Sequence, residues 1–118
     1  MNSLVGKKKD KLHLRPKIKN WYDLLLIEGD DGHWPIKVEL RDGMPTMAKN
    51  RPTKDKQWLY ITFVEKPARI CGFKVGDIIM QVGSLHNECH SMQDFKDNTY
   101  DHGFAVVTVY RKKEKSKK

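Results

Sequence analysis

The middle of the chain constrains the fold more tightly than any other part. It opens with an aromatic and β-branched run, Trp58–Val64, which has the composition of a strand. Pro67 stands at a first-turn position and Gly72 at a stop position, so Pro67–Cys71 is predicted to be one short helix. A glycine–aspartate turn then leads into a second strand, Asp77–Val82. The sequence therefore predicts a strand, a helical turn and another strand in close succession.

Further strands are predicted on the N-terminal side of this unit. The residues Pro35–Leu40 alternate apolar and polar, which is the pattern of a half-buried strand. Met44–Lys49 is expected to be the next strand, with Pro45 at a place where the ladder needs no N–H. The apolar run Trp21–Glu28 has no clear period, so it is either a short strand or a helical turn.

A longer helix and a closing strand are predicted on the C-terminal side. Ser91 is suited to cap the helix, with Asp94 three residues on in an arrangement like a capping box. The helix is expected over Met92–His102, and Gly103 ends it. The last strand is expected over Phe104–Tyr110.

Together these elements predict a small α+β domain, an antiparallel and partly open β-barrel or sandwich of five to six strands capped by two helices. The domain is expected over residues 34–111, with residues 20–33 as an N-terminal extension. Its core is expected to include Phe63, Cys71, Ile79, Phe95 and Val109.

The net charge of +8 comes from the two ends of the chain. Residues 1–19 hold seven Lys/Arg and one acidic residue, which gives a net charge of +6. Residues 111–118 hold six Lys/Arg and one acidic residue, which gives +5. Residues 20–110 are mildly acidic, at −3. We expect basic disordered tails over residues 1–19 and 112–118. They either only keep the domain in solution or add a weak contact with anionic membranes, and no specific nucleic acid is expected.

Several classes of protein are disfavoured. No run of 18 apolar residues is present, and Met1–Asp10 lacks the apolar stretch of a secretory signal, so a cytoplasmic location is expected. Two cysteines make no disulfide framework. The cluster His86–His90 has metal-ligand residue types, but no second cluster completes a tetrahedral set. Phosphate loops and nucleophile elbows are also missing, so we expect no metal, no cofactor and no catalysis.

The run from Pro67 to Ile79 resembles the signature of the PDZ domain family. It opens with Pro-Ala, as that family's short helix does, and continues with Gly-Phe-Lys-Val-Gly-Asp-Ile-Ile into the next strand. The order of elements over residues 34–111 agrees with the family. The resemblance implies a non-catalytic interaction module that binds the extended C-terminal peptide of a partner protein. The peptide would add a strand between the second strand, Met44–Lys49, and the longer helix.

The site that this resemblance implies consists of Arg41, Asp42, Gly43, Met44, Thr46, Met92 and Lys96. The N–H groups of Gly43 and Met44 would hold the terminal carboxylate, because backbone N–H nests bind anions. Arg41 or Lys37 would add charge-assisted support.

The residues of the longer helix would set ligand preference. Met92, as its first residue, favours an apolar ligand side chain two positions before the terminus, and Lys96 favours an acidic residue nearby. A register shifted by two residues would put His90 in the place of Met92 and favour Ser or Thr instead. Affinity in the micromolar range is expected.

Other functions stay open. Asp42 stands where the family has an apolar residue, and Pro45 follows at the edge of the predicted binding strand. The main alternative is a PDZ-like structural or self-associating domain with an impaired carboxylate groove, present as a monomer or weak dimer. Another is a regulatory module cut from a longer enzyme chain.

Overall fold

The computed structural model describes residues 17–99 and 103–112. The predictions of disorder for residues 1–16 and 113–118 therefore lie outside the described residues, as does the predicted end of the longer helix at His102. No helix in the described ranges is both long enough and apolar enough to span a membrane.

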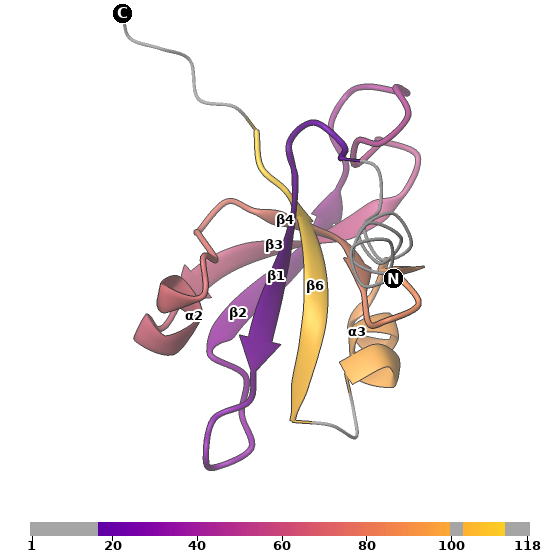
Figure 1. Ribbon diagram of the computed structural model, residues 1–118. Coiled ribbons are helices and arrows are strands. Elements are labelled where there is room, and N and C mark those ends of the chain that lie inside the picture. The colour runs from indigo at the N-terminus through magenta and orange to yellow at the C-terminus, as the bar shows by residue number, and fades with distance from the viewer. Residues whose placement is uncertain (1–16, 100–102, 113–118) are drawn as a thin grey trace, which may run out of the picture.

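The described residues form a small α+β fold with an open antiparallel sheet. In space the strands follow the order β1-β6-β4-β3-β2, and the short β5 pairs with β4. In Figure 1, β1 and β6 lie in front of β2 and β3, which cross behind them, and α2 and α3 stand on opposite sides. The elements are β1 (Trp21–Ile27), β2 (Ile36–Asp42), β3 (Gln57–Val64), α2 (Lys66–Ile70), β4 (Ile78–Val82), β5 (Asn87–Glu88), α3 (Met92–Thr99) and β6 (Phe104–Tyr110).

One predicted strand, Met44–Lys49, is wrong, and the ambiguous run Trp21–Glu28 contains a strand. Met44–Lys49 is not a strand, since within it only Met44 makes an isolated bridge, to Thr53, and Pro45 has no N–H for a ladder. The extension expected over residues 20–33 contains β1, which pairs with β6 from Trp21 to Ile27. The sheet therefore begins well before residue 34.

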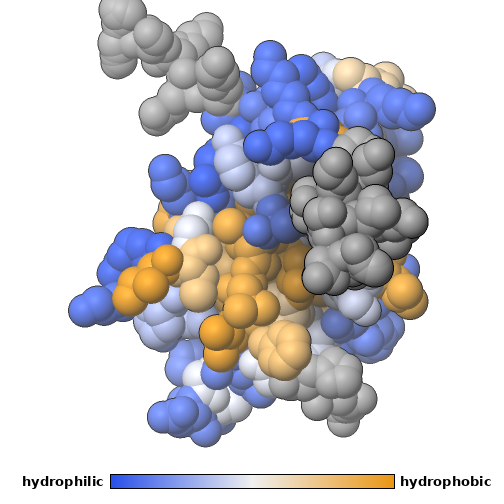
Figure 2. All heavy atoms as spheres, in the orientation of Figure 1, coloured by the Kyte–Doolittle hydropathy of each residue, from blue (hydrophilic) through white to orange (hydrophobic). Residues whose placement is uncertain are grey.

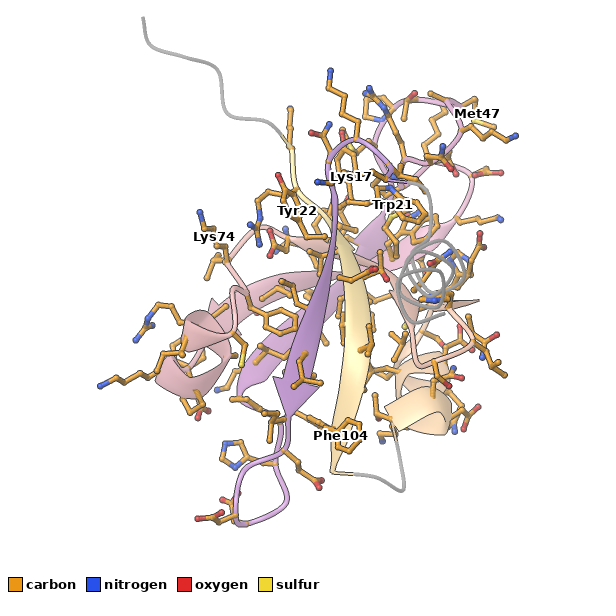
Figure 3. The ribbon with its side chains drawn as sticks, in the orientation of Figure 1. Lys17, Trp21, Tyr22, Met47, Lys74 and Phe104 are labelled. Atoms are coloured by element: carbon orange, nitrogen blue, oxygen red, sulfur yellow. The ribbon has the colours of Figure 1, made fainter. Side chains whose placement is uncertain are left out.

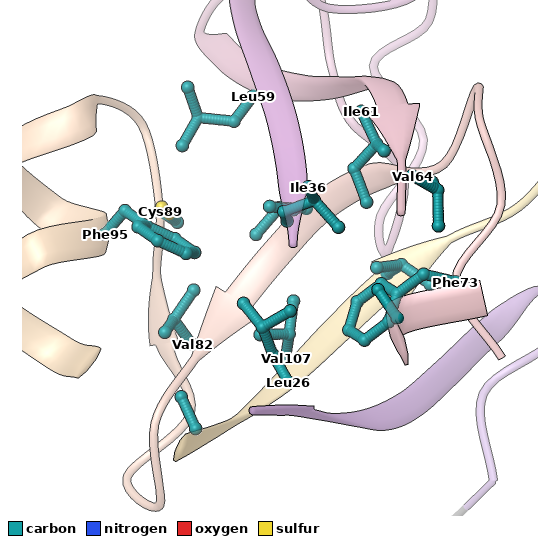
Figure 4. Packing of buried hydrophobic residues seen from close by; sticks show 14 residues of the cluster. Leu26, Ile36, Leu59, Ile61, Val64, Phe73, Val82, Cys89, Phe95 and Val107 are labelled. Atoms are coloured by element: carbon teal, nitrogen blue, oxygen red, sulfur yellow. The ribbon is translucent and has the colours of Figure 1, made fainter. Parts of the chain in front are cut away.

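The main core lies between the two layers of the sheet and the helices (Figure 4). Leu59 and Ile61 of β3 face it together with Ile79 of β4. The predicted burial of Ile79, Phe95 and Val109 is confirmed, and Cys71 packs against the cluster. The cluster consists of Leu26, Ile36, Leu59, Ile61, Val64, Ala68, Phe73, Ile79, Val82, Cys89, Phe95, Ala105, Val107 and Val109.

The predicted burial of Phe63 is wrong, because its side chain is 48% exposed. Strict alternation after Ile61 would point Phe63 into the core. The pairing with β2 instead contains a bulge, since Ile61 and Phe63 face consecutive residues of β2 and Thr62 faces none. The extra residue reverses the alternation, so Val64 is buried in place of Phe63.

A second apolar cluster occupies the opposite face of the sheet. Trp58, Ile78, Met80 and Tyr110 form its buried part. Met44 of the loop between β2 and β3 packs against it, as does Trp21 at the start of β1. Strands β3, β4 and β6 are therefore covered on both faces at this end, which explains why the loop of residues 43–56 is folded onto the sheet.

The C-terminal end of β6 is clamped to the turn before β4. Arg111 Nε and Nη2 each donate to one carboxylate oxygen of Asp77 at 2.7 Å, and Nη2 also donates to the Gly72 carbonyl at 2.8 Å. The guanidinium lies 4.6 Å from the centre of the Tyr22 ring. Asp77 is 1% exposed, so the predicted turn aspartate is half of a largely buried ion pair.

Candidate functional site

The two amides predicted to hold a carboxylate are already bonded inside the loop between β2 and β3. Gly43 N–H donates to the Lys56 carbonyl at 3.1 Å, and Met44 N–H donates to the Pro52 carbonyl at 2.6 Å. A Cβ on Gly43 would lie 2.0 Å from the Thr53 carbonyl oxygen. Gly43 is thus needed for a close approach of two backbone segments, and neither amide is open to a ligand.

The other predicted residues of this segment are also engaged locally. Arg41 donates to Glu39 at 2.7 Å, and its guanidinium lies 5.3 Å from the centre of the Tyr60 ring. The carboxylate of Asp42 accepts a hydrogen bond from Gln57 at 3.2 Å. Within residues 17–99 and 103–112, no hydrogen bond or ion pair joins these side chains to Met92 or Lys96 on α3.

Thr46 belongs to the same loop. Its hydroxyl oxygen accepts the N–H of Ala48 at 3.0 Å. The predicted site residues therefore fall into two groups: Arg41, Asp42, Gly43, Met44 and Thr46 at the end of β2 and in the loop after it, and Met92 and Lys96 on α3.

Strand β2 presents an open backbone edge. The carbonyls of Pro35 and Lys37 face β3 and its end, because they accept from Glu65 N–H at 2.9 Å and from the Thr62 hydroxyl at 3.3 Å. Backbone groups alternate along a strand, so those of the even-numbered residues point the other way. No described strand pairs with this side of β2. The outward backbone groups belong to Ile36, Val38 and Leu40.

The side chains of the same three residues share the core face of β2. Ile36 is buried, Val38 is half-buried against the main core, and Leu40 is 41% exposed. The open edge thus combines free backbone donors and acceptors with an apolar surface that becomes more exposed towards the end of the strand.

Helix α3 adjoins the entry to this edge. Trp34, two residues before β2, meets Phe95 of α3 edge-to-face with ring centroids 6.0 Å apart. The predicted cap is confirmed, because Ser91 Oγ accepts Asp94 N–H at 3.1 Å and the Asp94 carboxylate accepts His90 N–H at 2.8 Å. Met92 is the first helical residue, as predicted, and is 44% exposed. Lys96, one turn on, is exposed.

The alternative register, with His90 as the first residue of the helix, is wrong. His90 lies before the cap, and its ring packs against Trp58 with centroids 4.3 Å apart. Its Nδ1 lies 3.0 Å from the Gln57 carbonyl and its Nε2 lies 2.8 Å from a Glu88 carboxylate oxygen. The hydrogen bond with His90 also lowers the pKa of Glu88. His90 therefore ties the segment before α3 to β3.

The loop that enters β2, residues 28–35, is held by His33. Its ring hydrogen-bonds to Asp31 and, at 3.1 Å, to Glu65 beside α2, and its carbonyl accepts Gly29 N–H. The bond with Asp31, followed by that with Glu65, raises the pKa of His33, and His33 lowers the pKa of Asp31. The sequence signal missed here is the group His-Trp-Pro-Ile at residues 33–36, which directly precedes and enters the open-edged strand.

The two cysteines differ in burial, Cys71 being half-buried and Cys89 buried. Both are free thiols. Burial raises the pKa of Cys89 to about 12, so this thiol stays protonated at neutral pH. Its Sγ lies 3.7 Å from the Ser91 carbonyl. In the described ranges, no group of three or more His, Cys, Asp or Glu side chains is placed to hold a metal ion.

Comparison with models of protein families finds no match, and no curated protein matches the chain.

Proposed function

We propose that this protein is a non-catalytic peptide-binding module of the PDZ type, which adds an extended segment of a partner protein to the open edge of β2. The observation that carries the proposal is the outward-facing backbone of Ile36, Val38 and Leu40 beside an apolar surface. Such an edge can take a further strand by main-chain hydrogen bonds. The order of strands and helices along the chain supports the family resemblance.

The binding strand in this proposal is β2 and no longer Met44–Lys49. A ligand strand on the open edge would lie on the side of β2 where Trp34 meets α3. Met92 and Lys96 keep the roles expected of them, an apolar contact and a contact with an acidic ligand residue. Arg41, Asp42, Gly43, Met44 and Thr46 have no direct role, because their groups are bonded within the loop and β3.

A free C-terminal carboxylate contributes little to binding. The loop that enters β2 reads His-Trp-Pro-Ile, and Pro35 in it donates no N–H. Trp34 N–H makes no hydrogen bond within the described part of the chain and is the remaining donor ahead of Ile36. Glu28, Asp30 and Asp31 stand in the same loop and repel an anion. Micromolar affinity, about −8 kcal/mol, is expected from main-chain bonds and apolar contacts.

Matched peptides with free and amidated C-termini test this proposal. A hydrogen bond to a charged group contributes about 1.5–3 kcal/mol. If the loop bound the terminal carboxylate, amidation of the peptide would therefore weaken binding by more than about tenfold. We expect a smaller loss. A loss above tenfold would show that the loop of residues 28–35 holds carboxylates despite Pro35.

The edge itself is tested with Val38→Pro, which removes one outward N–H and leaves the ladder with β3 intact. The matched control is Leu25→Pro on β1. The Glu28 N–H donates to the Gly103 carbonyl, and the Asn20 carbonyl accepts the Arg111 N–H, so the even-numbered residues of β1 face β6. The backbone groups of Leu25 therefore point away from β6, towards the other open edge of the sheet. We expect Val38→Pro to weaken peptide binding at least tenfold and Leu25→Pro to leave it unchanged. Equal binding by the two variants would exclude β2 as the docking strand.

Self-association is the second candidate, and one observation favours it. On the outer face of β1, Leu25 and Ile27 are 43% and 47% exposed, opposite Val106 and Phe104 of β6. Figure 2 shows an apolar patch over this part of the molecule. Sedimentation of the wild type beside Leu25→Lys decides whether two copies pair through this face, since the charge would break such a dimer.

A further inference from the structure

Three separate segments of the chain meet at one end of the molecule. The indole N–H of Trp21 donates to the Asn50 carbonyl at 2.7 Å, which joins the loop of residues 43–56 to the start of β1. Arg111 N–H donates to the Asn20 carbonyl at 2.8 Å, which brings the end of β6 to the same place. Figure 3 shows Lys17, Trp21 and Met47 at this end. We call it the basic end.

The basic end concentrates positive charge. Six cationic side chains at this end are exposed and make no ion pair within the described residues. Two other cations at this end are paired, Lys56 with Glu88 and Arg111 with Asp77, and the loop also holds one exposed carboxylate, that of Asp55. In the sequence, residues 1–16 hold five further Lys/Arg and residues 113–118 hold four, each set with one acidic residue. Figure 2 shows the hydrophilic colour spread across this end. The six cations are Lys17, Lys19, Lys49, Arg51, Lys54 and Lys112.

An apolar side chain stands at the tip of the loop, among these cations. Met47 is 66% exposed, and Figure 3 shows it at the outer end of the loop. The loop beneath is held by Met44 N–H to the Pro52 carbonyl at 2.6 Å and by the Trp58 indole N–H to the Thr53 carbonyl at 3.0 Å. A fixed base therefore holds Met47 out towards solvent.

We propose that the basic end docks on an anionic lipid surface, with Met47 entering the boundary between headgroups and acyl chains and the cations lying over the headgroups. Exposed cations beside an anionic leaflet attract it, and an apolar tip adds a contact that only a bilayer can accept. A nucleic acid fits less well, because the loop of residues 43–56 contains no aromatic residue to stack on bases. Of the aromatic residues beside it, Trp58 is 2% exposed, Trp21 is tied to the loop by its indole N–H, and the Tyr22 ring lies against the Arg111 guanidinium. This contact is separate from the edge of β2.

Vesicle co-sedimentation of the full chain tests the proposal, with vesicles of phosphatidylcholine alone and with 30% phosphatidylserine. The loop variant is Lys49→Gln with Arg51→Gln. Its matched control is Lys66→Gln with Lys74→Gln, which removes the same charge from exposed positions in α2 and the turn after it. At about 1 kcal/mol per cation near an anionic surface, we expect the loop variant to bind about thirtyfold more weakly and the control to lose much less. Equal losses in the two variants would overturn the proposal, because net charge alone would then explain binding.

Met47→Ser separates a bilayer from any other polyanion. We expect this variant to bind phosphatidylserine vesicles several-fold more weakly and a short DNA duplex as well as the wild type does. Two results together would overturn the lipid assignment: unchanged vesicle binding by Met47→Ser, and equally weakened binding of vesicles and DNA by the loop variant. The basic end would then be a surface for polyanions in general. Thermal unfolding of each variant checks that the fold is retained.

Discussion

Arg111 is expected to contribute far more to stability than its place beside a basic tail implies. Replacing it with Met keeps much of the aliphatic stem and removes the guanidinium that pairs with Asp77 at 2.7 Å through both carboxylate oxygens. Asp77, 1% exposed, would keep one donor, the Lys74 N–H at 3.0 Å. Breaking a buried pair on one side costs about 3–5 kcal/mol, because an uncompensated charge stays buried.

The Arg111→Met variant is measured by urea unfolding, followed through tryptophan fluorescence. With a slope of about 2 kcal/mol per molar urea, the midpoint should fall by about 2 M. The matched control is Arg41→Met, whose ion pair with Glu39 is more than half exposed on both sides and contributes at most about 1 kcal/mol. Equal small losses in the two variants would refute the view that the Asp77–Arg111 pair clamps the end of β6. Adding Asp77→Asn should restore part of the loss, since it removes the stranded charge.

Two further predictions concern the core and the loop that enters β2. Ile79→Ala should cost about 2–5 kcal/mol, whereas Phe63→Ala should cost less than about 1 kcal/mol, and similar losses in calorimetry would contradict the bulge at Thr62. His33, bonded to Asp31 and Glu65, should titrate above its ordinary value of 6.5 by NMR. Because the folded-state pKa is raised, its contribution to stability is complete below pH 6.5 and is lost as the pH rises through the raised pKa. His33→Gln should remove that pH dependence, and a pKa of His33 at or below 6.5 would contradict the hydrogen-bonded arrangement.

Local sequence was enough to place several elements. Helix α2 follows from Pro67 at its start and Gly72 after it, where φ is +106° and glycine is favoured. Helix α3 follows from the Ser91 cap, and with it the position of Met92. Strand β3 follows from its aromatic and β-branched composition. In each case the determining contacts lie within a few residues, so the pattern of side chains predicts the element directly.

Tertiary structure alone decided which backbone edge is open and therefore where the proposed binding strand lies. Strand β1 has an ambiguous pattern by itself and becomes a strand by pairing with β6, at the far end of the chain. In the sequence Gly43 looks like part of a ligand loop. In the structure a glycine is needed there because the Thr53 carbonyl oxygen would lie 2.0 Å from a Cβ at this position. The bulge at Thr62 reverses the alternation of β3, so the Phe63 side chain points to solvent and that of Val64 points into the core. These outcomes depend on partners distant in sequence, and a local pattern carries no information about the residues that the folded chain brings alongside it.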